Sequence, residues 1–328
     1  METRRPTNPA AEEILGLYFP VLDHGFVALV DYMGSDEDVE RAARVSYGYG
    51  TRRTSETRGL VRYLRRHRHT TPSAMVELKF HCAMPIFVAR QIIRHRVANV
   101  NEYSGRYSLL PLLFYRPAAA DVQAQSATNR QGRAGAVAET VYAEAIERWE
   151  RVRRLAAEHY EWLVQRDVAR ELARIDLPLS TYTQWYWKID LHNLFHFLSV
   201  RVDPHAQLET RAYARVMAGM LKRVAPLSFE AWWDYEYGGA HLSRGELMAL
   251  GRLVEVQGRG LEARSGARVT AADLASLGLS KREVDELLAK LAAPPPADDF
   301  DLDPSAARSA EHFAREMEAA VPRVDRRT

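Results

Sequence analysis

The residues best suited to bind an anionic ligand lie in a short basic segment about one third of the way along the chain. The sequence QIIRHR at 91–96 ends an expected helix, and NEYSGR at 101–106 follows in a polar loop. Ser104, Gly105 and Arg106 can offer a hydroxyl, an unhindered backbone N–H and a guanidinium to one phosphate. A helix dipole favours cations in its last turn, but this does not explain the histidine between two arginines. The segment therefore predicts a phosphate-binding site.

A second polar cluster lies in WKIDLHNLFHFLSVR at 187–201. His192 and His196 have the i, i+4 spacing that zinc enzymes use, but asparagine follows the first histidine where an H-E-x-x-H motif has glutamate. Asp190, His192, His196 and Arg201 are more typical of polar contacts to a ligand at a helix face. A zinc-dependent hydrolase that uses His192 and His196 stays open as an alternative function.

Three further segments carry weaker signals. Arg174 precedes an expected helix break at Pro178, where it could either cap the helix or bind a ligand. His69 and Thr71 belong to a polar loop, for which ordinary surface polarity is the simplest interpretation. Cys82 is the only cysteine, which excludes an intrachain disulfide and a cysteine-cluster metal site. Its place among alternating apolar residues favours a buried structural thiol over a reactive one.

Composition limits the classes of function that need to be considered. The 328 residues carry a net charge of only +2, although just five of the 45 basic residues are lysine. This balance gives no support for nucleic-acid binding, so only the Arg-rich helix expected at 52–68 keeps a nucleic-acid-binding protein as a second alternative. The mean hydropathy is −0.34, no apolar run is long enough to cross a membrane, and the N-terminus lacks a signal-peptide core. We therefore expect a cytoplasmic protein.

The elements that must position these residues form a mixture of strands and helices. In MVELKFHCAM at 75–84, apolar and polar residues alternate, which predicts a strand with Glu77, Lys79 and His81 on one face. A second strand is expected at 24–34, and 117–135 reads as a mobile surface loop. Helices are expected to begin at Ser35 and Pro85 and to occupy 53–68, 136–176, 181–201 and 204–224.

A change in composition predicts a domain boundary near residue 243. Beyond this point aromatic residues nearly vanish, so we expect a main domain at 1–242 and a helical C-terminal extension of unknown role at 243–328. Within the extension, TAADLASLGLSKREVDELLAKL predicts one capped helix or a pair of helices. The segment APPPADDFDLDP predicts a linker, and SAARSAEHFAREMEAAV predicts a final helix.

The chain resembles the flavin-dependent thymidylate synthases. Their signature is R-H-R, seven residues and S, which this sequence matches with Arg94-His95-Arg96 and Ser104. The resemblance extends over residues 24–240 in DYMGSDEDVERAARVSYG, PIFVARQIIRHR, NEYSGRYS, QAQSATNRQGR and WKIDLHNLFHFLSVRVDPHAQ. The last 85 or so residues have no counterpart in this comparison.

The resemblance implies a reductive methylation of dUMP to dTMP. Methylenetetrahydrofolate would supply the carbon, and NADPH would supply the reducing power through bound FAD. The implied fold is α+β, with a central, mostly antiparallel sheet flanked by long helices, in a homotetramer with active sites at subunit interfaces. The implied dUMP-binding residues are Gln91, Arg94, Glu102, Ser104, Gly105, Arg106, Arg174 and Arg201. The implied FAD-binding residues are Thr71, Arg94, His95, Arg96, Glu102, Asp190, His192 and His196, with Ser46 and His69 as weaker candidates and no metal.

In this interpretation Arg201 is the catalytic residue. A permanent positive charge near N3 and O2 of uracil would stabilise the ionised ring, and no enzyme thiol is needed. The chain departs from the family pattern at Ala74 and Met75, where a polar or acidic residue and a histidine are common. It also has Asp190 where many members have asparagine, which alters the hydrogen bonding expected for the flavin.

Overall fold

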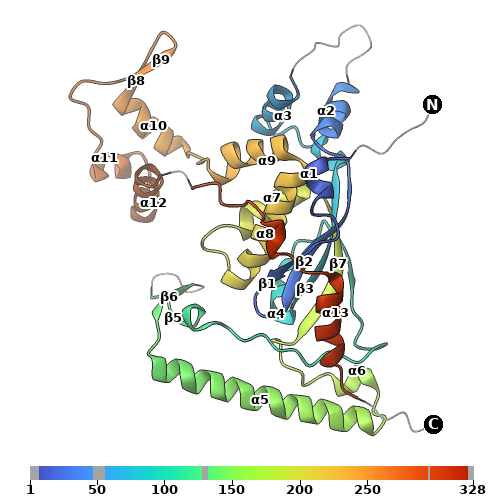
Figure 1. Cartoon of the computed structure of the whole chain (residues 1–328). Coiled ribbons are helices and arrows are strands. Elements are labelled where there is room, and N and C mark those ends of the chain that lie inside the picture. The colour runs from blue at the N-terminus through green and yellow to red at the C-terminus, as the bar shows by residue number, and fades with distance from the viewer. Residues whose placement is uncertain (1–6, 47–55, 128–131, 295, 324–328) are drawn as a thin grey trace, which may run out of the picture. The chain divides into compact units, whose positions relative to one another are not determined.

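The computed structural model describes residues 7–46, 56–127, 132–294 and 296–323 of the chain (Figure 1). The chain divides into two compact units. The first comprises residues 1–231 together with 300–328, and the second comprises residues 232–299. Within the described residues, no helix combines the length and the apolar composition that a membrane crossing requires.

A five-stranded sheet forms the centre of the first unit. Its strand order is β1-β2-β3-β7-β4, and every neighbouring pair is antiparallel. The strands are β1 (Tyr18–Val21), β2 (Gly25–Met33), β3 (Glu77–Pro85), β4 (Asn99–Glu102) and β7 (Tyr182–Asp190). The α+β class with an antiparallel central sheet is therefore the fold observed.

The strand β7 corrects the helix expected at 181–201. Only its second half is helical, as α7 (Leu191–Arg201). The first half alternates with a period of two, because Trp185, Trp187 and Ile189 are buried while the residues between them are more exposed. Such alternation is the strand pattern, and the neighbouring β3 pairs with all nine of these residues.

The two faces of the sheet differ in chemistry. Cys82 is fully buried on the face covered by α7 and α8 (Leu208–Val224), where the rings of Trp187 and Phe197 lie 4.9 Å apart. On the other face, the Lys188 ammonium lies 3.0 Å from the Glu77 carboxylate, and the His81 ring stacks on Tyr186. The predicted alternation of β3 is confirmed, as is the burial of Cys82.

The remaining elements of the first unit differ from the sequence expectation mainly in their bounds. The segment 136–176 contains two helices rather than one, and the loop 117–135 contains a 3₁₀ turn and a two-stranded ribbon. Residues 52–55 of the Arg-rich helix and residues 128–131 of that loop lie outside the described residues. The elements are α1 (Pro9–Glu12), α2 (Asp36–Arg44), α3 (Thr57–Arg66), η1 (Ser73–Met75), α4 (Ile86–Ile92), η2 (Ala119–Asp121), β5 (Gln123–Gln125), β6 (Arg133–Ala136), α5 (Glu139–Gln165), α6 (Arg170–Ala173), α9 (Pro226–Trp232), η4 (Pro304–Ala306) and α13 (Ala310–Ala319).

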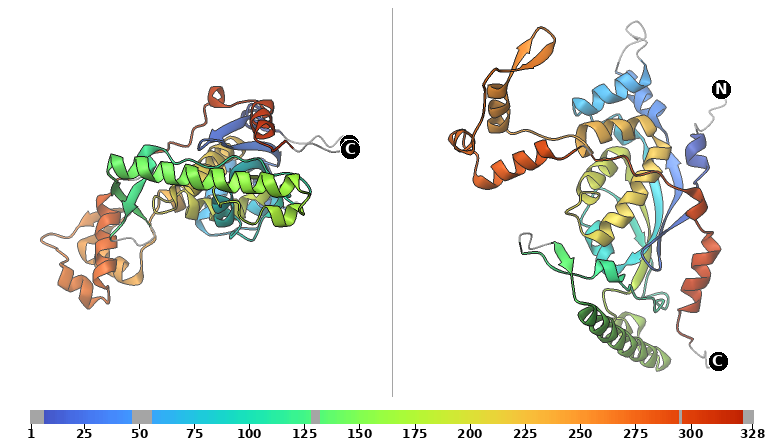
Figure 2. Two further views of the ribbon diagram at one scale, coloured as in Figure 1. Left: turned by 90° about the horizontal axis from the view of Figure 1, so that it is seen from below. Right: turned by 60° about the vertical axis from the view of Figure 1, so that its left-hand side comes forward.

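The C-terminal helix α13 returns to the first unit, on the side of the sheet opposite α8 (Figure 2). Its residues Phe313 and Met317 pack against Phe26 of β2. Just before it, Arg308 exchanges two backbone hydrogen bonds with Tyr18, at 2.8 and 3.2 Å. The compact units therefore differ from the division expected at residue 242, since residues 300–328 belong with the sheet.

The second unit has a small core of its own. Ala249, Leu274, Leu279, Val284 and Leu287 are buried together in it. The expected capped segment is a pair of helices, and a β-hairpin that the sequence analysis did not predict precedes it. The elements are η3 (Trp233–Tyr237), α10 (Arg244–Leu253), β8 (Val254–Gln257), β9 (Gly260–Ala263), α11 (Ala271–Ser276) and α12 (Lys281–Ala292).

A buried carboxylate joins α2 to α9. Asp36 is 6% exposed and accepts hydrogen bonds from Leu227 N at 2.7 Å, Ser228 N at 2.8 Å and Ser228 Oγ at 2.6 Å. We expect Asp36→Ala to lower the free energy of unfolding by about 2–4 kcal/mol, because it leaves buried donors without an acceptor. Urea titration measures this. The exposed neighbour variant Glu37→Ala is the control, and equal effects of the two substitutions would contradict the assignment.

Candidate functional site

The end of α4 and the start of α7 are joined through His95. Its Nε2 lies 3.1 Å from the carbonyl oxygen of Asn193, and its ring centroid lies 5.4 Å from that of His196. Asp190 caps α7 by accepting hydrogen bonds from Asn193 N at 2.9 Å and Asn193 Nδ2 at 2.6 Å. The structure thus brings together three residues of the predicted flavin set, His95, Asp190 and His196.

The protonation state of His95 follows from these contacts. A carbonyl can only accept, so Nε2 carries the hydrogen and Nδ1 keeps a lone pair. Burial lowers the pKa of His95, the hydrogen bond to Asn193 and the charge of Asp190 oppose this shift, and the neighbouring Arg201 guanidinium lowers the pKa further. A neutral imidazole at neutral pH, with Nδ1 as an acceptor, is the result.

His192 presents a buried polar atom on the same helix. Its Nδ1 is shielded from solvent and has no hydrogen-bond partner among the residues that the structure describes. Buried polar atoms of native proteins nearly always have a partner. The atom is therefore consistent with a hydrogen bond to a bound group, as the resemblance implies for His192.

Arg201 lies at the other end of α7, next to the end of α4. Its Nη2 donates to the carbonyl oxygen of Gln91 at 3.3 Å. Burial lowers the pKa of Arg201, but a guanidinium remains charged at neutral pH. The structure thus brings Gln91 and Arg201 together and holds a fixed positive charge there.

A second group forms around Gly105. A Cβ added at Gly105 would lie 3.1 Å from both Cδ and Nη1 of Arg174. In the same turn, Arg106 N donates to Ser104 Oγ at 3.3 Å, and Arg106 Nε lies 2.9 Å from a Glu171 carboxylate oxygen. The guanidinium of Arg174 is therefore packed against the very backbone predicted to bind phosphate.

The strand β4 connects the two groups. His95 lies before it and Gly105 after it, and its four residues span roughly 13 Å at about 3.3 Å per residue. Glu102, at its end, accepts a hydrogen bond from Thr183 Oγ1 at 2.8 Å. Glu102 therefore lies on the Gly105 side of the strand, with its carboxylate held against β7.

The other predicted residues occupy the surface around these groups. Arg94 and Arg96 are exposed in the turn after α4, and Thr71 is exposed just before η1, which packs beside α7. Met75, one of the two departures, is 51% exposed in η1. The weaker candidates Ser46 and His69 are exposed, and the His69 ring stacks on Tyr63 at 5.9 Å.

Two contributors to this geometry were missed from the sequence. Asn193 links Asp190 to His95, and Arg170 donates through Nη1 to the carbonyl oxygen of Tyr107 beside the Gly105 turn. For Asn193 a signal existed, because Asp-x-x-Asn at a helix start has the spacing of an N-cap contact. For Arg170, no local pattern distinguished it from the many surface arginines.

The two alternative functions find little support in this geometry. Within the described residues, no group of three or more His, Cys, Asp or Glu side chains could hold a metal ion. In α3, Arg58 and Arg62 form ion pairs with Glu230, and the Arg65 guanidinium lies 4.2 Å from the centre of the Phe195 ring. These three arginines are thus engaged in contacts within the unit, which reduces the positive charge that the helix can offer to a nucleic acid.

Comparison with known proteins gives a consistent result. A protein-family model described as "Thymidylate synthase complementing protein" matches residues 28–227. The flavin-dependent thymidylate synthase of Gluconobacter oxydans is 50% identical over 292 residues, covering 88% of this chain and 92% of the relative. That of Rickettsia bellii is 44% identical and covers 87% and 97%. Because such coverage extends beyond residues 1–242, part of the C-terminal extension does have counterparts, contrary to the sequence expectation.

Solved structures include similar chains. The crystal structure of the UMP/dUMP methylase PolB from Streptomyces cacaoi, bound with 5-Br dUMP, has a TM-score of 0.59 and 32% sequence identity. The match covers 65% of this chain and 95% of that one. The structure of the same enzyme with 5-Br UMP gives the same TM-score, identity and share of this chain.

Proposed function

Since the chain belongs to the flavin-dependent thymidylate synthase family, we propose a specific division of labour for its methylation of dUMP. Methylenetetrahydrofolate donates the carbon, NADPH is the reductant, and FAD is the bound cofactor. The Gly105 group binds the phosphate of dUMP, and Arg201 faces the uracil ring. The main support for the phosphate assignment is the packing of Arg174 against Gly105. This contact brings two segments that are distant in the sequence together in one anion site.

The phosphate end depends on charge and on close approach. Arg174 and Arg106 can each donate charge-assisted hydrogen bonds to phosphate oxygens, and Ser104 adds a hydroxyl. The missing side chain of Gly105 lets a phosphate reach the backbone N–H. Arg106 would exchange its exposed ion pair with Glu171 for the phosphate, a small loss because exposed pairs contribute little. Glu102 lies at the same end of β4, whereas Arg94 lies at the other end and would contact the same dUMP only from a neighbouring subunit.

The uracil end depends on Arg201. The C5 carbon of uracil becomes nucleophilic only as negative charge develops on the ring. A guanidinium placed at N3 and O2 stabilises that charge. The bond from Arg201 to the carbonyl of Gln91 orients the guanidinium without neutralising it, because a carbonyl carries no net charge.

The residues around α7 fit a flavin. His192 offers a buried nitrogen, His95 offers an acceptor at Nδ1, and exposed Arg94 and Arg96 can pair with a pyrophosphate. Residues proposed to hold FAD are Thr71, Arg94, His95, Arg96, Glu102, Asp190, His192 and His196. The bound flavin supplies the hydride, so these side chains bind and orient rather than react.

A homotetramer with shared active sites accounts for two further features. The two groups lie at opposite ends of β4, and most of their side chains are open to solvent in the single chain. The helix α5 also exposes a series of large apolar residues that favour burial against another subunit. These are Val141, Trp149, Val152, Leu155 and Trp162. We place this assembly in the cytoplasm, where its nucleotide and folate substrates occur.

An absorbance spectrum tests the proposal most directly. Purified protein should be yellow, its flavin bands should change when dUMP is added, and it should form dTMP only with both methylenetetrahydrofolate and NADPH. Size-exclusion chromatography with light scattering should give four chains. Colourless protein that binds neither FAD nor dUMP would contradict the assignment.

A further inference from the structure

The side chain of Glu102 is held against β7 at both of its ends. Its backbone lies opposite Trp185 in the register of β4 and β7, and the next residue, Tyr103, donates its N–H to the carbonyl oxygen of Gln184 at 2.8 Å. At the other end, Thr183 Oγ1 donates to a carboxylate oxygen of Glu102 at 2.8 Å. Strand pairing therefore fixes where the side chain begins, and this hydrogen bond fixes where it points.

Thr183 is well placed to orient a neighbouring side chain. It is 4% exposed and lies in β7, which pairs with β3 on one side and with β4 on the other. Branching at Cβ restricts the rotamers of threonine, so the hydroxyl of this buried residue has a fixed direction. Glu102 is exposed, and ordering an exposed glutamate on binding costs rotamer entropy. The hydrogen bond from Thr183 orders the carboxylate before a ligand arrives, which favours binding.

The second carboxylate oxygen of Glu102 is left for a ligand. Within the described part of the chain, Thr183 provides the only hydrogen bond to this carboxylate, and no cation pairs with it. An ionised carboxylate can only accept hydrogen bonds, so it selects a ligand group that donates one. It would repel a phosphate placed directly against it. Glu102 is therefore suited to a neutral donor that lies beside the phosphate proposed at Gly105.

The nucleotide dUMP has two such donors outside its phosphate, the N3–H of uracil and the 3′-hydroxyl of the sugar. The uracil N3 is the atom proposed to face Arg201. The 3′-hydroxyl is the donor nearer to the phosphate. Glu102 precedes Gly105 by three residues, which span at most about 10 Å, so the sugar is the part of the nucleotide within its reach.

We propose that Thr183 is a positioning residue for dUMP, which acts through Glu102 on the 3′-hydroxyl of the sugar. This inference rests on the proposed function, in which the phosphate of dUMP lies at Gly105. Thr183 itself does not touch the nucleotide. It holds one oxygen of the carboxylate so that the other oxygen accepts the hydrogen of the hydroxyl. A nucleotide without a 3′-hydroxyl gains nothing from Thr183.

Steady-state kinetics of Thr183→Val with varied dUMP tests this role. Valine keeps the branched shape of threonine but lacks the hydroxyl. We expect the KM for dUMP to rise about tenfold, the effect of losing one hydrogen bond to a charged group. Since the lost contact serves binding, kcat should fall by less than about twofold, and the flavin should stay bound. Thr183→Ser keeps the hydroxyl donor and should restore a KM within about twofold of wild type.

Two comparisons show whether the effect passes through Glu102 to the sugar. The nucleotide 2′,3′-dideoxyuridine 5′-monophosphate lacks the 3′-hydroxyl, so its inhibition constant against dUMP should be the same for wild type and Thr183→Val. In Glu102→Ala the carboxylate is absent. Adding Thr183→Val to that variant should change the dissociation constant of dUMP, measured by calorimetry, by less than about twofold, because residues that share one contact are not additive.

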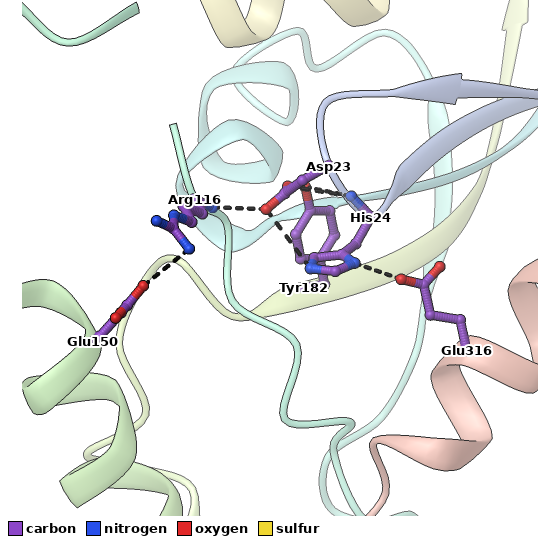
Figure 3. A network of polar contacts seen from close by, with 6 residues as sticks. All are labelled: Asp23, His24, Arg116, Glu150, Tyr182 and Glu316. Atoms are coloured by element: carbon purple, nitrogen blue, oxygen red, sulfur yellow. Dashed lines mark hydrogen bonds and ion pairs between the residues drawn. The ribbon is translucent and has the colours of Figure 1, made fainter. Parts of the chain in front are cut away.

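Tyr182→Phe is the matched control for a disturbed strand. Tyr182 is the neighbour of Thr183 in β7, and its hydroxyl donates to Asp23 at 2.5 Å. Figure 3 shows this hydroxyl directed at Asp23, which also accepts a hydrogen bond from Arg116 N at 2.7 Å. The substitution removes a buried hydroxyl from the same strand without removing a contact to Glu102, so it should leave the KM for dUMP unchanged.

The results separate this inference from the proposed function. Wild type that forms no dTMP from dUMP would overturn both. Active wild type with the same KM as Thr183→Val would overturn only the role of Thr183. That role is also overturned if the dideoxy nucleotide is affected as much as dUMP, if Tyr182→Phe has the same effect, or if Thr183→Val loses its flavin, since each indicates a general disturbance of β7.

Discussion

Arg201→Ala is expected to abolish nearly all dTMP formation while the protein keeps its flavin. Removing one donor that stabilises developing charge costs about 10²–10³ in kcat, and Arg201 is the fixed charge proposed to face the uracil ring. Its side chain donates to the carbonyl of Gln91 rather than to a residue of the flavin set. The visible spectrum should therefore be retained, and initial rates with saturating dUMP should show the loss.

The conservative variant and a distant one complete this test. Arg201→Lys should recover part of the rate, since it keeps the charge but loses the planar pair of donors. Arg259→Ala removes an exposed arginine of the turn between β8 and β9 and should leave kcat unchanged. Near-wild-type turnover in Arg201→Ala would refute the role, whereas loss of flavin together with activity would indicate a structural role instead.

The sequence predicted best where a local pattern reports on a single element. The alternation of Glu77, Lys79 and His81 correctly assigned β3 because one face of that strand is polar. The same rule applied to Trp185, Trp187 and Ile189, but the apolar helix pattern that follows from Leu191 masked it. The boundary between β7 and α7 lies at Asp190, which caps the helix by accepting a hydrogen bond from Asn193 N. The Asp-x-x-Asn spacing indicates such a cap only where a helix start is already expected.

Long-range contacts could not be predicted in the same way. Nothing in the composition of the C-terminal segment indicates that Phe313 would pack on Phe26 or that Arg308 would pair with Tyr18. These contacts form because the other helices leave this face of the sheet uncovered. Which face is left uncovered depends on the whole fold and not on any local pattern. The division at residue 242 was inferred from composition alone. Composition could not indicate that α13 packs with the first unit.

The site divides along the same line. The signature at Arg94, His95, Arg96 and Ser104 is local, and the residue types alone were enough to predict a binding site there. The approach of Arg174 to Gly105 is not local, and only the family resemblance connected them before the structure placed them in contact. The types of polar residues thus indicated the kind of ligand to expect. Only the tertiary structure shows which of these side chains lie close enough together to contact one ligand.

Gly105→Ala tests that contact, and we expect it to raise the KM for dUMP at least about tenfold, equivalent to about 1.4 kcal/mol. The new Cβ would lie 3.1 Å from Cδ and Nη1 of Arg174 and from Cδ1 of Leu110. Arg174 is flexible, so it should move aside, and the protein should stay folded. The displaced guanidinium would then no longer meet the phosphate in the right geometry. Steady-state kinetics with varied dUMP measures the effect.

The pattern of parameters separates this explanation from a general loss of structure. Because the substitution acts on the phosphate end, KM should rise more than kcat falls, and the flavin spectrum should be unchanged. Gly59→Ala in α3 is the control, since a Cβ there meets no atom within 4 Å and alanine is the better helix former. An unchanged KM in Gly105→Ala would show that the phosphate does not lie between Gly105 and Arg174. A parallel fall in kcat and flavin content would instead indicate that the turn supports the fold.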